Sequence, residues 1–467
     1  MAENHKYFFS CDSCTYSRWS IHKSSWQKRL IYRACIAKKH PKLCLIKGNY
    51  SLLFMTKRDR FFNPLRQAKT ASAKTLIADV INQMQNYERH LGLRKRSRKK
   101  RDLEIFNRQI EAIICEAVHR HLTGADKRIA ISLSNRHLSR KDSESSILNN
   151  TLSQNIKNLA TPEMAFLEVQ AGNQKTGEVT SFWAGKRLKT RINERKLTYL
   201  DLTLEKSKNV LELRAEKVNG QAKGRLIKYP ETELATQYRD EMEQINAFLR
   251  SADICYHGDK DIDDSRIELK CIFNNGSFEQ GGRVYGGFWI SMKSEDIRDI
   301  TIDDEWVVSL DYGQMAVRLA YSLAKAPITF DDGYLIPNWE KAREATKKLI
   351  NVMLNSTSSN EWTMPKKIQK LYPYRENIEQ HLIADIYSFH KPITKLFGKT
   401  NGMKFMFMES EILVDVLLRL NSKGIVALPI HDCILVKESA KNIAKEVMLK
   451  AFKEHTNLDA TVAIEAL

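Results

Sequence analysis

The spacing of apolar residues along the chain predicts several helices. The run from Ile105 to Leu122 (IFNRQIEAIICEAVHRHL) has the 3.6-residue apolar period of an amphipathic helix, and Gly124 closes it. Another helix is expected over about 65–90. A third is expected from Pro230 to about residue 250, because proline is tolerated in the first turn of a helix.

A period of two replaces the helical period between residues 163 and 229. Leucines alternate with polar residues in Leu200–Leu204, and Val210–Arg214 alternates in the same way before a turn at Asn219-Gly220. This pattern predicts a small antiparallel sheet. The preceding stretch, 138–160, is rich in Ser, Asn and Lys and is expected to be a polar connector. The remainder of the chain mixes short apolar strands with helices, which indicates an α+β fold.

Composition places the chain among soluble globular proteins. Of its 467 residues, 42% are hydrophobic and 28% are charged, and no apolar run is long enough for a membrane span. The first residues lack the apolar segment of a signal peptide. Eight cysteines are too few for a disulfide scaffold, so a reducing compartment and a cytoplasmic location are expected.

Positive charge is concentrated in the first fifth of the chain. The formal net charge is +19, and residues 1–101 supply all of it, with 24 Lys and Arg against five acids. The densest run, RKRSRKKR, begins with Arg94, Lys95 and Arg96, which we expect to bind nucleic acid; a solvated linker is the alternative. Aromatic residues between the cations favour nucleic acid over a phospholipid surface, because bases stack on rings: Trp19, Trp26, Tyr32, Phe61 and Phe62.

These patterns divide the chain into three expected parts. Residues 1–104 form a basic nucleic-acid-binding module, and residues 105–230 form a helical and small antiparallel-sheet region. Residues 231–467 form an α+β core, and this core carries the residues with candidate chemistry.

Two segments of this core join an apolar run to an aspartate. The run WVVSL leads into Asp311, and a helical pattern follows at once. Two further apolar runs flank His431-Asp432, which predicts a hairpin with an acid at its tip. Aspartates on neighbouring strands can share two divalent ions, one activating an attacking hydroxyl and the other the leaving phosphate oxygen. Each aspartate taken alone is more often a turn or cap residue.

A third segment, KAREATKKLINVMLN, predicts a helix over 341–355 with two distinct faces. One face carries polar residues at intervals of four: Arg343, Lys347, Asn351 and Asn355. The opposite face is apolar: Ala345, Leu349 and Met353. A polar face led by two cations suits a nucleoside triphosphate, although alone it also describes an ordinary surface helix.

Together the three segments resemble family A DNA polymerases. D-Y-G-Q-M-A-V-R, from Asp311 to Arg318, is similar to motif A (D-Y-S-Q-I-E-L-R). His431-Asp432-Cys433 is similar to motif C, which is H-D-E in that family and H-D-S in phage-type single-subunit RNA polymerases. The 343–355 helix resembles motif B, R-x3-K-x3-(F/M)-x3-Y-G, in the same order along the chain. Upstream, G-R-V-Y at 282–285 is similar to the T-G-R-L segment of the DNA polymerases and the G-R-V-Y of the RNA polymerases.

The resemblance implies a right-hand polymerase with an antiparallel-sheet palm and helical fingers. It implies that Asp311 and Asp432 hold two Mg²⁺ ions, or Mn²⁺, for in-line phosphoryl transfer. Arg343 and Lys347 would neutralise the nucleotide phosphates, and Lys347 would serve as the catalytic cation that protonates pyrophosphate.

The resemblance also implies nucleic-acid contacts, and it leaves two ways to align motif B with the chain. Arg283, Arg318 and His431 would contact the primer–template, although an internal ion pair is an equal alternative for Arg318. Matching Asn351 to an asparagine of the family would give the phosphate-binding role to Lys348, so both lysines belong to the candidate nucleotide site. Lys347 is preferred for this role, because with Arg343 matched to the motif B arginine two of the motif's spacings agree.

Two departures from the motifs fall where the family selects the sugar. The motif A glutamate that excludes a 2′-hydroxyl is Ala316, and the motif B tyrosine is Asn355, followed by Ser356 in place of glycine. The phage RNA polymerases also carry a small residue at the first position but keep the tyrosine. Both residues therefore join the candidate nucleotide site and predict ribonucleotide use. Cys433 replaces the second acid of motif C and leaves Asp432 as the ligand.

Neither a proofreading nuclease nor a zinc finger is well supported. Asp201 and Glu205 lie four residues apart, not in the D-x-E spacing of exonuclease domains. A structural Zn²⁺ site is an open alternative near the beginning of the chain, where the second half lacks finger spacing and ordinary thiols are expected instead: Cys11, Cys14, Cys35, His40 and Cys44.

The leading interpretation is a DNA-directed nucleotidyltransferase: a DNA polymerase with primase-like ribonucleotide use, of the kind found in the replication of mobile elements. Its partners would be a DNA primer–template and nucleoside triphosphates, with RNA as an alternative template or product, and no membrane. A single-subunit RNA polymerase is one alternative, although the chain is short for promoter recognition. A catalytically inactive polymerase-fold protein that binds nucleic acid is another. The retained Asp311, Asp432, Arg343 and Lys347 argue against it, since a binding protein needs none of them.

Overall fold

The computed structural model divides the chain into two units, Met1–Arg58 and Asp59–Leu467. It describes residues 60–124, 128–133, 147–173, 178–206, 209–218, 223–356, 363–372 and 377–465. The first unit, with the candidate zinc ligands and the aromatic residues up to Tyr32, lies outside the described residues. The second unit contains two hydrophobic clusters, called here the N-terminal core (residues 60–206) and the C-terminal core (residues 209–465).

The N-terminal core combines amphipathic helices with short strands. Its helices are α2 (Ala71–His90), α3 (Lys100–Thr123), α5 (Asn150–Leu159), α6 (Lys186–Glu194) and the 3₁₀ helix η1 (Tyr199–Asp201). Four strands pair in the order β1 (Arg60–Phe61), β3 (Ile129–Ala130), β5 (Ser181–Ala184) and β4 (Leu167–Gln170). A separate antiparallel pair is formed by β2 (Arg66–Ala68) and β6 (Leu202–Leu204).

The C-terminal core contains two sheets. The larger sheet has the order β14 (Ala427–Ile430), β15 (Cys433–Lys437), β13 (Glu305–Gly313), β12 (Ile300–Ile302) and β9 (Ile254–Tyr256), and β16 (Thr461–Glu465) also pairs with β13. These pairings are antiparallel. The smaller sheet has the order β11 (Ser277–Tyr285), β10 (Lys270–Asn274), β7 (Leu211–Arg214) and β8 (Leu226–Ile227). The mixed α+β composition predicted from the sequence is confirmed, and the larger sheet is antiparallel.

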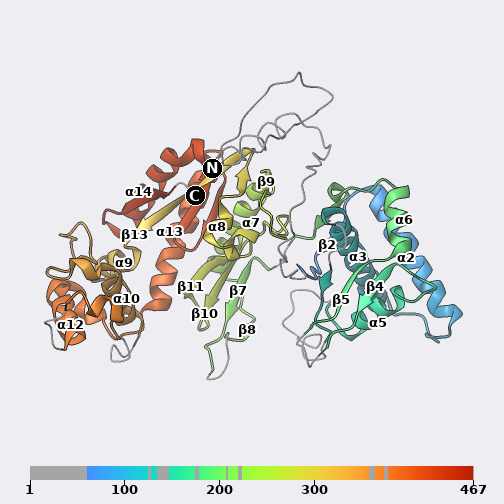
Figure 1. The fold of residues 1–467 in the computed structure, drawn as a ribbon, viewed down its shortest axis with the longest axis horizontal. Helices are drawn as coiled ribbons and strands as arrows, with labels where there is room; N and C mark the ends of the chain where they lie inside the picture. Colours follow the sequence, from blue (N-terminus) through green and yellow to red (C-terminus); the bar gives the residue numbers. More distant parts are fainter. Residues whose placement is uncertain are drawn as a thin grey trace, which may run out of the picture. The chain divides into compact units, whose positions relative to one another are not determined.

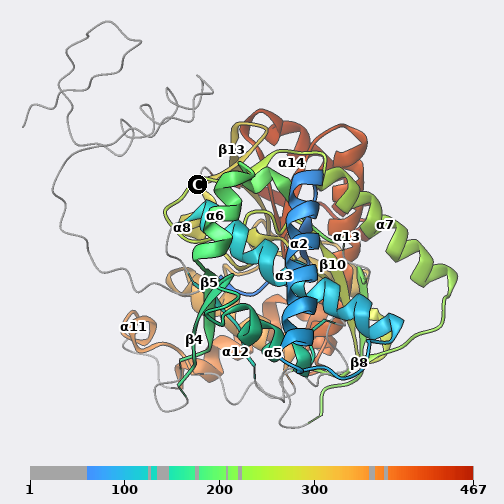
Figure 2. The same cartoon turned by 90° about the vertical axis from the view of Figure 1, so that its right-hand side faces the viewer.

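Helices cover these sheets and fill the connection between β13 and β14. The α-helices are α7 (Glu233–Leu249), α8 (Ser294–Ile297), α9 (Met315–Ala324), α10 (Arg343–Asn355), α11 (Lys366–Gln369), α12 (Ile378–Phe389), α13 (Gly402–Ser422) and α14 (Lys441–Thr456). The 3₁₀ helices are η2 (Phe288–Ser291), η3 (Glu340–Ala342), η4 (Lys391–Leu396) and η5 (Glu438–Ala440). Helix α13 contacts both β11 and α14 (Figure 1), and α7 lies beside α13 (Figure 2). Within the part of the chain described here, no helix combines the length and the apolar character that crossing a membrane requires.

The polar connector expected over 138–160 is wrong for its second half, which forms α5. Asn149 caps this helix by accepting a hydrogen bond from the Thr151 amide at 2.9 Å. Leu152, Ile156 and Leu159 are buried at helical spacing. The asparagines that made the segment look like a loop are also inside: Asn155 is 4% exposed and donates to Gln109 Oε1 at 2.7 Å.

The single sheet expected over 163–229 is also wrong, although the alternating segments do form strands. β4 and β5 pair with each other, β6 pairs with β2, and β7 pairs with β8 and β10. Local alternation identifies a strand but not its partner, because the partner is fixed by the core that the strand joins. The predicted boundary after residue 104 falls inside α3, which begins at Lys100. The two cores divide instead between Leu202 and Val210.

A buried ion cluster joins residues of both cores. Arg66, 1% exposed, donates from Nε to Glu116 Oε2 at 2.6 Å and from Nη2 to Asp263 Oδ2 at 2.7 Å. Arg60 lies 3.8 Å from the same Asp263 carboxylate. Two carboxylates without a cation would be costly at this depth, since charges leave water only when they are paired.

Arg66→Ala is expected to lower the free energy of unfolding by ~3–5 kcal/mol, because it leaves Glu116 and Asp263 buried without their main partner. Urea unfolding measures this effect. The matched control is Arg239→Ala, which breaks the exposed pair between Arg239 and Glu231 (Nη1 to Oε2, 2.8 Å) and should cost ~1 kcal/mol or less. Equal losses in the two variants would contradict the role assigned to the buried cluster.

Candidate active site

Asp311 stands near the end of the central strand of the larger sheet. The buried side chains of Val307, Val308 and Leu310 hold β13 in the core, and Tyr312 donates from its hydroxyl to the Met448 carbonyl at 2.6 Å. β13 is hydrogen-bonded on both edges, to β15 and to β16. The strand therefore presents the half-buried Asp311 carboxylate from a rigid position.

Asp432 lies in the two-residue turn of the hairpin formed by β14 and β15. Ile430 and Cys433 pair across the hairpin, which leaves His431 and Asp432 as the turn, and His431 adopts the left-handed φ of 58°. Cys433 also pairs with Asp311 across β13 and β15. Asp432 is thus next in sequence to the cross-strand neighbour of Asp311, and the predicted hairpin with an acid at its tip is confirmed.

The two carboxylates and a third acid act on one another. Burial, together with the negative charges of Asp432 and Glu465, raises the pKa of Asp311 to about 6, and the positive charge of Lys347 opposes the rise. Glu465 is on β16, where it pairs with Ser309 two residues before Asp311. A cation placed among these acids would relieve their repulsion.

Asp311→Asn is expected to stabilise the folded protein above about pH 6 when no divalent cation is present. The ordinary pKa of this carboxyl is 3.8, so its folded-state pKa of about 6 means that ionisation favours the unfolded chain. The gain should be full above pH 6, decline as the pH falls, and vanish below about pH 4, where the carboxyl is protonated in both states. Thermal unfolding in EDTA from pH 4 to 8 measures it, with the exposed Glu446→Gln as control. A variant less stable than wild type at pH 8 would contradict this electrostatic account.

The donor set suits Mg²⁺ or Mn²⁺ better than a zinc ion. Among the described residues, no three His, Cys, Asp or Glu side chains are grouped so as to enclose a metal. Mg²⁺ does not need such a cage, because it binds through one or two carboxylates and completes its shell with water and substrate phosphates. Burial raises the pKa of the Cys433 thiol to about 12, and its sulfur lies 3.0 Å from Ser309 Oγ, so Cys433 stays neutral. Asp311 and Asp432 therefore fit Mg²⁺, with the carboxylate of Glu465 nearby.

Helix α10 carries the predicted phosphate-binding cations. Its apolar face is buried as expected, through Ala345, Leu349 and Met353. Lys347 and Lys348 are both exposed, and neither forms an ion pair with another described residue. Lys347 is among the charges that act on Asp311, which agrees with the motif B register that gives it the catalytic position.

Arg343 is already bound to carboxylates. Its Nε donates to Asp332 Oδ2 at 2.6 Å and its Nη1 donates to Glu344 Oε1 at 2.9 Å, with the guanidinium 5.6 Å from the centre of the Tyr334 ring. Asp332 occupies the kind of position that a phosphate oxygen would take. A phosphate group would therefore have to compete with Asp332 for this arginine.

The connection that carries Asp332 is anchored to the motif A strand. Gln314 has a left-handed φ of 61° between β13 and α9, and its amide donates to the Asp331 carbonyl at 2.9 Å and accepts from the Gly333 amide at 2.7 Å. His390, which is fully buried, contacts the Gly333 carbonyl through Nε2 at 2.7 Å. These bonds hold the 331–334 connection between motif A and the end of α12.

Arg283 projects from β11 beside the hairpin turn. Its Nη2 donates to Glu409 Oε2 on α13 at 2.7 Å. Burial raises the pKa of Glu409 although Arg283 opposes this, and Asp432 adds to the rise. Burial and then the Arg283 charge lower the pKa of His431. Arg283, His431 and Asp432 are therefore neighbours, and Glu409 orients the arginine.

The other motif residues lie at the ends of α9 and α10. Arg318 is 5% exposed and donates to the Asp459 carbonyl, so the internal contact is the one present in the structure. Ala316 is in the first turn of α9 and packs against the C-terminal core. Asn355 ends α10 with its Oδ1 only 3.0 Å from where a Cβ on Gly402 would lie. Neither Ala316 nor Asn355 has a side chain as large as the glutamate and the tyrosine of the motifs that they resemble.

Arg94, Lys95 and Arg96 lie on the exposed connection between α2 and α3, far along the chain from the motif residues. Arg94 is 3.9 Å from Glu88, and Arg98 binds the same carboxylate at 2.7 Å while its guanidinium lies 3.6 Å from the centre of the Phe106 ring. Most cations of this run are therefore exposed, whereas Arg98 binds groups within the protein.

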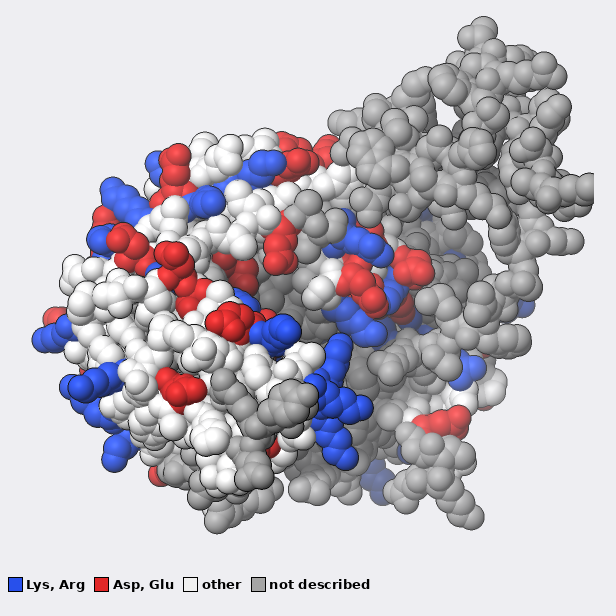
Figure 3. Space-filling model, turned by 60° about the vertical axis from the view of Figure 1, so that its left-hand side comes forward, with Lys and Arg blue, Asp and Glu red and all other residues white. Residues whose placement is uncertain are grey.

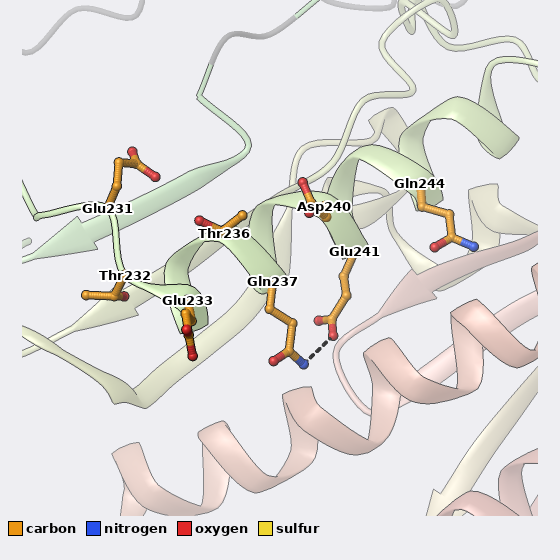
Figure 4. A pocket seen from close by; sticks show the side chains of 8 residues that line it. All are labelled: Glu231, Thr232, Glu233, Thr236, Gln237, Asp240, Glu241 and Gln244. Atoms are coloured by element: carbon orange, nitrogen blue, oxygen red, sulfur yellow. Dashed lines mark hydrogen bonds between the residues drawn. The ribbon is translucent and has the colours of Figure 1, made fainter.

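A surface hollow along α7 is lined by acids and amides rather than by cations (Figure 4). Gln237 donates to Glu241 Oε1 at 2.8 Å within it. The lining residues are Glu231, Thr232, Glu233, Thr236, Gln237, Asp240, Glu241 and Gln244. None belongs to the predicted motifs, and the acids would repel a phosphate backbone.

Three acids at the site were not predicted from the sequence: Glu465, Glu409 and Asp332. The alternating end of the chain, TVAIE, is a strand pattern that could have drawn attention to Glu465. Glu409 and Asp332 carry no comparable signal, because their importance comes from arginines distant in sequence. No known protein-family profile matches this chain, and no curated protein matches it in sequence at a significant level.

Proposed function

We propose that this chain is a template-directed nucleotidyltransferase, a DNA polymerase. In this proposal the sheet around β13 is the palm and helices α10 to α12 belong to the fingers. The single observation that supports it most is the pairing of Asp311 with Cys433, which brings the motif A and motif C aspartates together at one end of an antiparallel sheet. Lys347 of motif B acts on the same carboxylate.

The reaction joins a primer 3′-hydroxyl to the α-phosphate of a nucleoside triphosphate. The O3′–P bond forms, the bond from the α-phosphorus to the β-phosphate bridging oxygen breaks, and pyrophosphate leaves. Mg²⁺ held by Asp311 and Asp432 would lower the pKa of the attacking hydroxyl and offset the charge on the leaving oxygen. Lys347 places a positive charge on the phosphate side and can donate a proton to pyrophosphate.

Arg343 binds the outer phosphates by exchanging one anion for another. In the free protein Asp332 accepts from its Nε. A triphosphate offers more negative charge than one carboxylate, so it displaces Asp332 and keeps the guanidinium paired. This exchange makes nucleotide binding depend on the 331–334 connection.

Arg283 and His431 face the primer–template end of the site in this proposal. Glu409 holds the Arg283 guanidinium in place from α13. Because His431 shares the turn with Asp432, a nucleic acid contact at His431 would also fix the hairpin that carries the metal ligand.

A single-subunit RNA polymerase is the second candidate, and Ala316 is the observation that favours it. A methyl group at this position leaves room for a 2′-hydroxyl. The two candidates differ in whether a primer is needed and in which sugar is preferred.

Incorporation of labelled dNTPs and rNTPs by the full chain, on primed and unprimed DNA templates with Mg²⁺, tests both candidates. The proposal predicts primer-dependent incorporation of dNTPs. Efficient rNTP incorporation on unprimed templates with little dNTP use would favour the RNA polymerase. No incorporation of either substrate would leave a nucleic-acid-binding protein with a polymerase fold and would refute the proposal.

A further inference from the structure

The C-terminal core has an uneven charge distribution. Residues 209–465 contain 34 Lys and Arg against 38 acids, yet residues 341–408 within them contain 12 Lys and Arg against only five acids. From residue 386 to residue 408 there is no acid at all, and this stretch includes four lysines: Lys391, Lys395, Lys399 and Lys404. We call these four lysines and Tyr387 the η4 surface.

The lysines of the η4 surface are exposed and project from an anchored backbone. None of them forms an ion pair or side-chain hydrogen bond with another residue in the described ranges. The segment is tied to the end of α10, where the Gly398 amide donates to the Met353 carbonyl at 2.7 Å and the Asn401 amide donates to the Leu354 carbonyl at 3.1 Å. Figure 3 brings the side of α10 and α12 forward and shows Lys and Arg side chains projecting at its outer margin.

Tyr387 adds an aromatic ring to this cationic surface. It lies on the last turn of α12, is 42% exposed, and packs edge-on against Phe397 with the ring centres 5.2 Å apart. Phe397 itself is 7% exposed, so it supports the tyrosine from below. A supported ring with an open side can stack with an unpaired base.

We propose that the η4 surface binds single-stranded nucleic acid, with the lysines contacting the backbone phosphates and Tyr387 stacking on a base. Cations on an anchored backbone and an exposed aromatic ring are the two elements from which single-strand sites are built. An acidic protein or an anionic lipid surface would use the lysines but would not need a ring positioned to stack. The proposal rests on the proposed function in one respect only, the identity of the bound strand. In a polymerase this strand would be the unpaired template next to α10.

The test compares binding of the full chain to a primer–template with a ten-nucleotide 5′ overhang and to the blunt duplex. Its first variant is the triple substitution Lys395→Gln, Lys399→Gln and Lys404→Gln. The matched control changes three lysines on α14: Lys441→Gln, Lys445→Gln and Lys450→Gln. Dissociation constants are measured by fluorescence anisotropy at several salt concentrations, without nucleotide, after thermal unfolding has shown that each variant is folded.

The η4 triple variant is expected to lose affinity for the overhang substrate and to lower its salt slope by about two, since each single-strand phosphate contact contributes ~0.7. The α14 control should keep both values. Tyr387→Ala should weaken overhang binding by about fivefold or more with an unchanged slope, whereas Tyr387→Phe should retain it. These results separate the charge contribution from the stacking contribution.

Two results would overturn the proposal: unchanged overhang affinity in the triple variant, or an equal loss of affinity for the blunt duplex. The measurement needs no catalysis. Loss of overhang binding in a protein that incorporates no nucleotide would therefore support the surface while refuting the polymerase.

Discussion

Asp311→Asn and Asp432→Asn are each expected to abolish nucleotide incorporation while leaving the fold and the affinity for DNA nearly unchanged. Each substitution removes one of the two carboxylates that would hold Mg²⁺ at the reacting phosphate, and the loss of several kcal/mol of transition-state stabilisation lowers the rate by more than about a thousandfold. Steady-state primer extension measures the effect. The two residues should be equivalent, because each lies at the same end of the β13–β15 pair.

The matched control is Asp331→Asn, an exposed aspartate that supplies its backbone carbonyl to Gln314. It should retain activity within about threefold of wild type, which is a smaller change in the activation free energy than a tenfold loss of rate would require. Activity within tenfold of wild type in either Asp311→Asn or Asp432→Asn would contradict the site assignment. Glu465→Gln should give an intermediate loss, since its charge acts on Asp311 from the neighbouring strand.

Ribonucleotide incorporation is expected to be far closer to deoxyribonucleotide incorporation than in polymerases that carry glutamate and tyrosine at the sugar positions. Ala316 offers only a methyl group, and Asn355 is placed at the end of α10 beside Gly402, where its amide can hydrogen-bond to a 2′-hydroxyl. The measurement is the ratio of kcat/KM for a dNTP and the matching rNTP on one template. Ala316→Glu should suppress rNTP use more than dNTP use.

A wild-type preference for dNTP above about 10⁴-fold, or ~5 kcal/mol, would show that another side chain excludes the 2′-hydroxyl. The control is Ala324→Glu at the far end of α9, which adds the same carboxylate about two turns away from Ala316 and should leave the sugar ratio unchanged. If Ala316→Glu and Ala324→Glu alter the ratio equally, the effect comes from helix stability and not from the sugar contact.

The elements that carry the site could be predicted from the sequence because each is defined by local pattern. The run before Asp311 is apolar and β-branched, and β13 forms there. The polar pair His431-Asp432 between two apolar runs gives the predicted hairpin turn. The α10 helix ends at Asn355 as predicted and has the predicted buried face, although it begins at Arg343 and not at residue 341.

The partners of these elements could not be predicted, because they depend on residues far apart in the chain. Asp332 binds Arg343, and Glu409 binds Arg283 across 126 positions of sequence. The α5 helix was missed because its asparagines have polar side chains that the fold nevertheless buries, as the bond between Asn155 and Gln109 shows. Polar residues usually indicate an exposed loop, but a buried polar side chain is stable when a residue distant in sequence forms a hydrogen bond with it.

The most direct test of the central claim is whether the template base chooses the nucleotide. Four primer–templates that differ only in the first unpaired template base are each incubated with the full chain, Mg²⁺ and one of the four dNTPs. The account predicts that the complementary nucleotide is incorporated in every case and that Asp432→Asn incorporates none. Incorporation of the same nucleotide whatever the template base, or incorporation that survives Asp432→Asn, would contradict it.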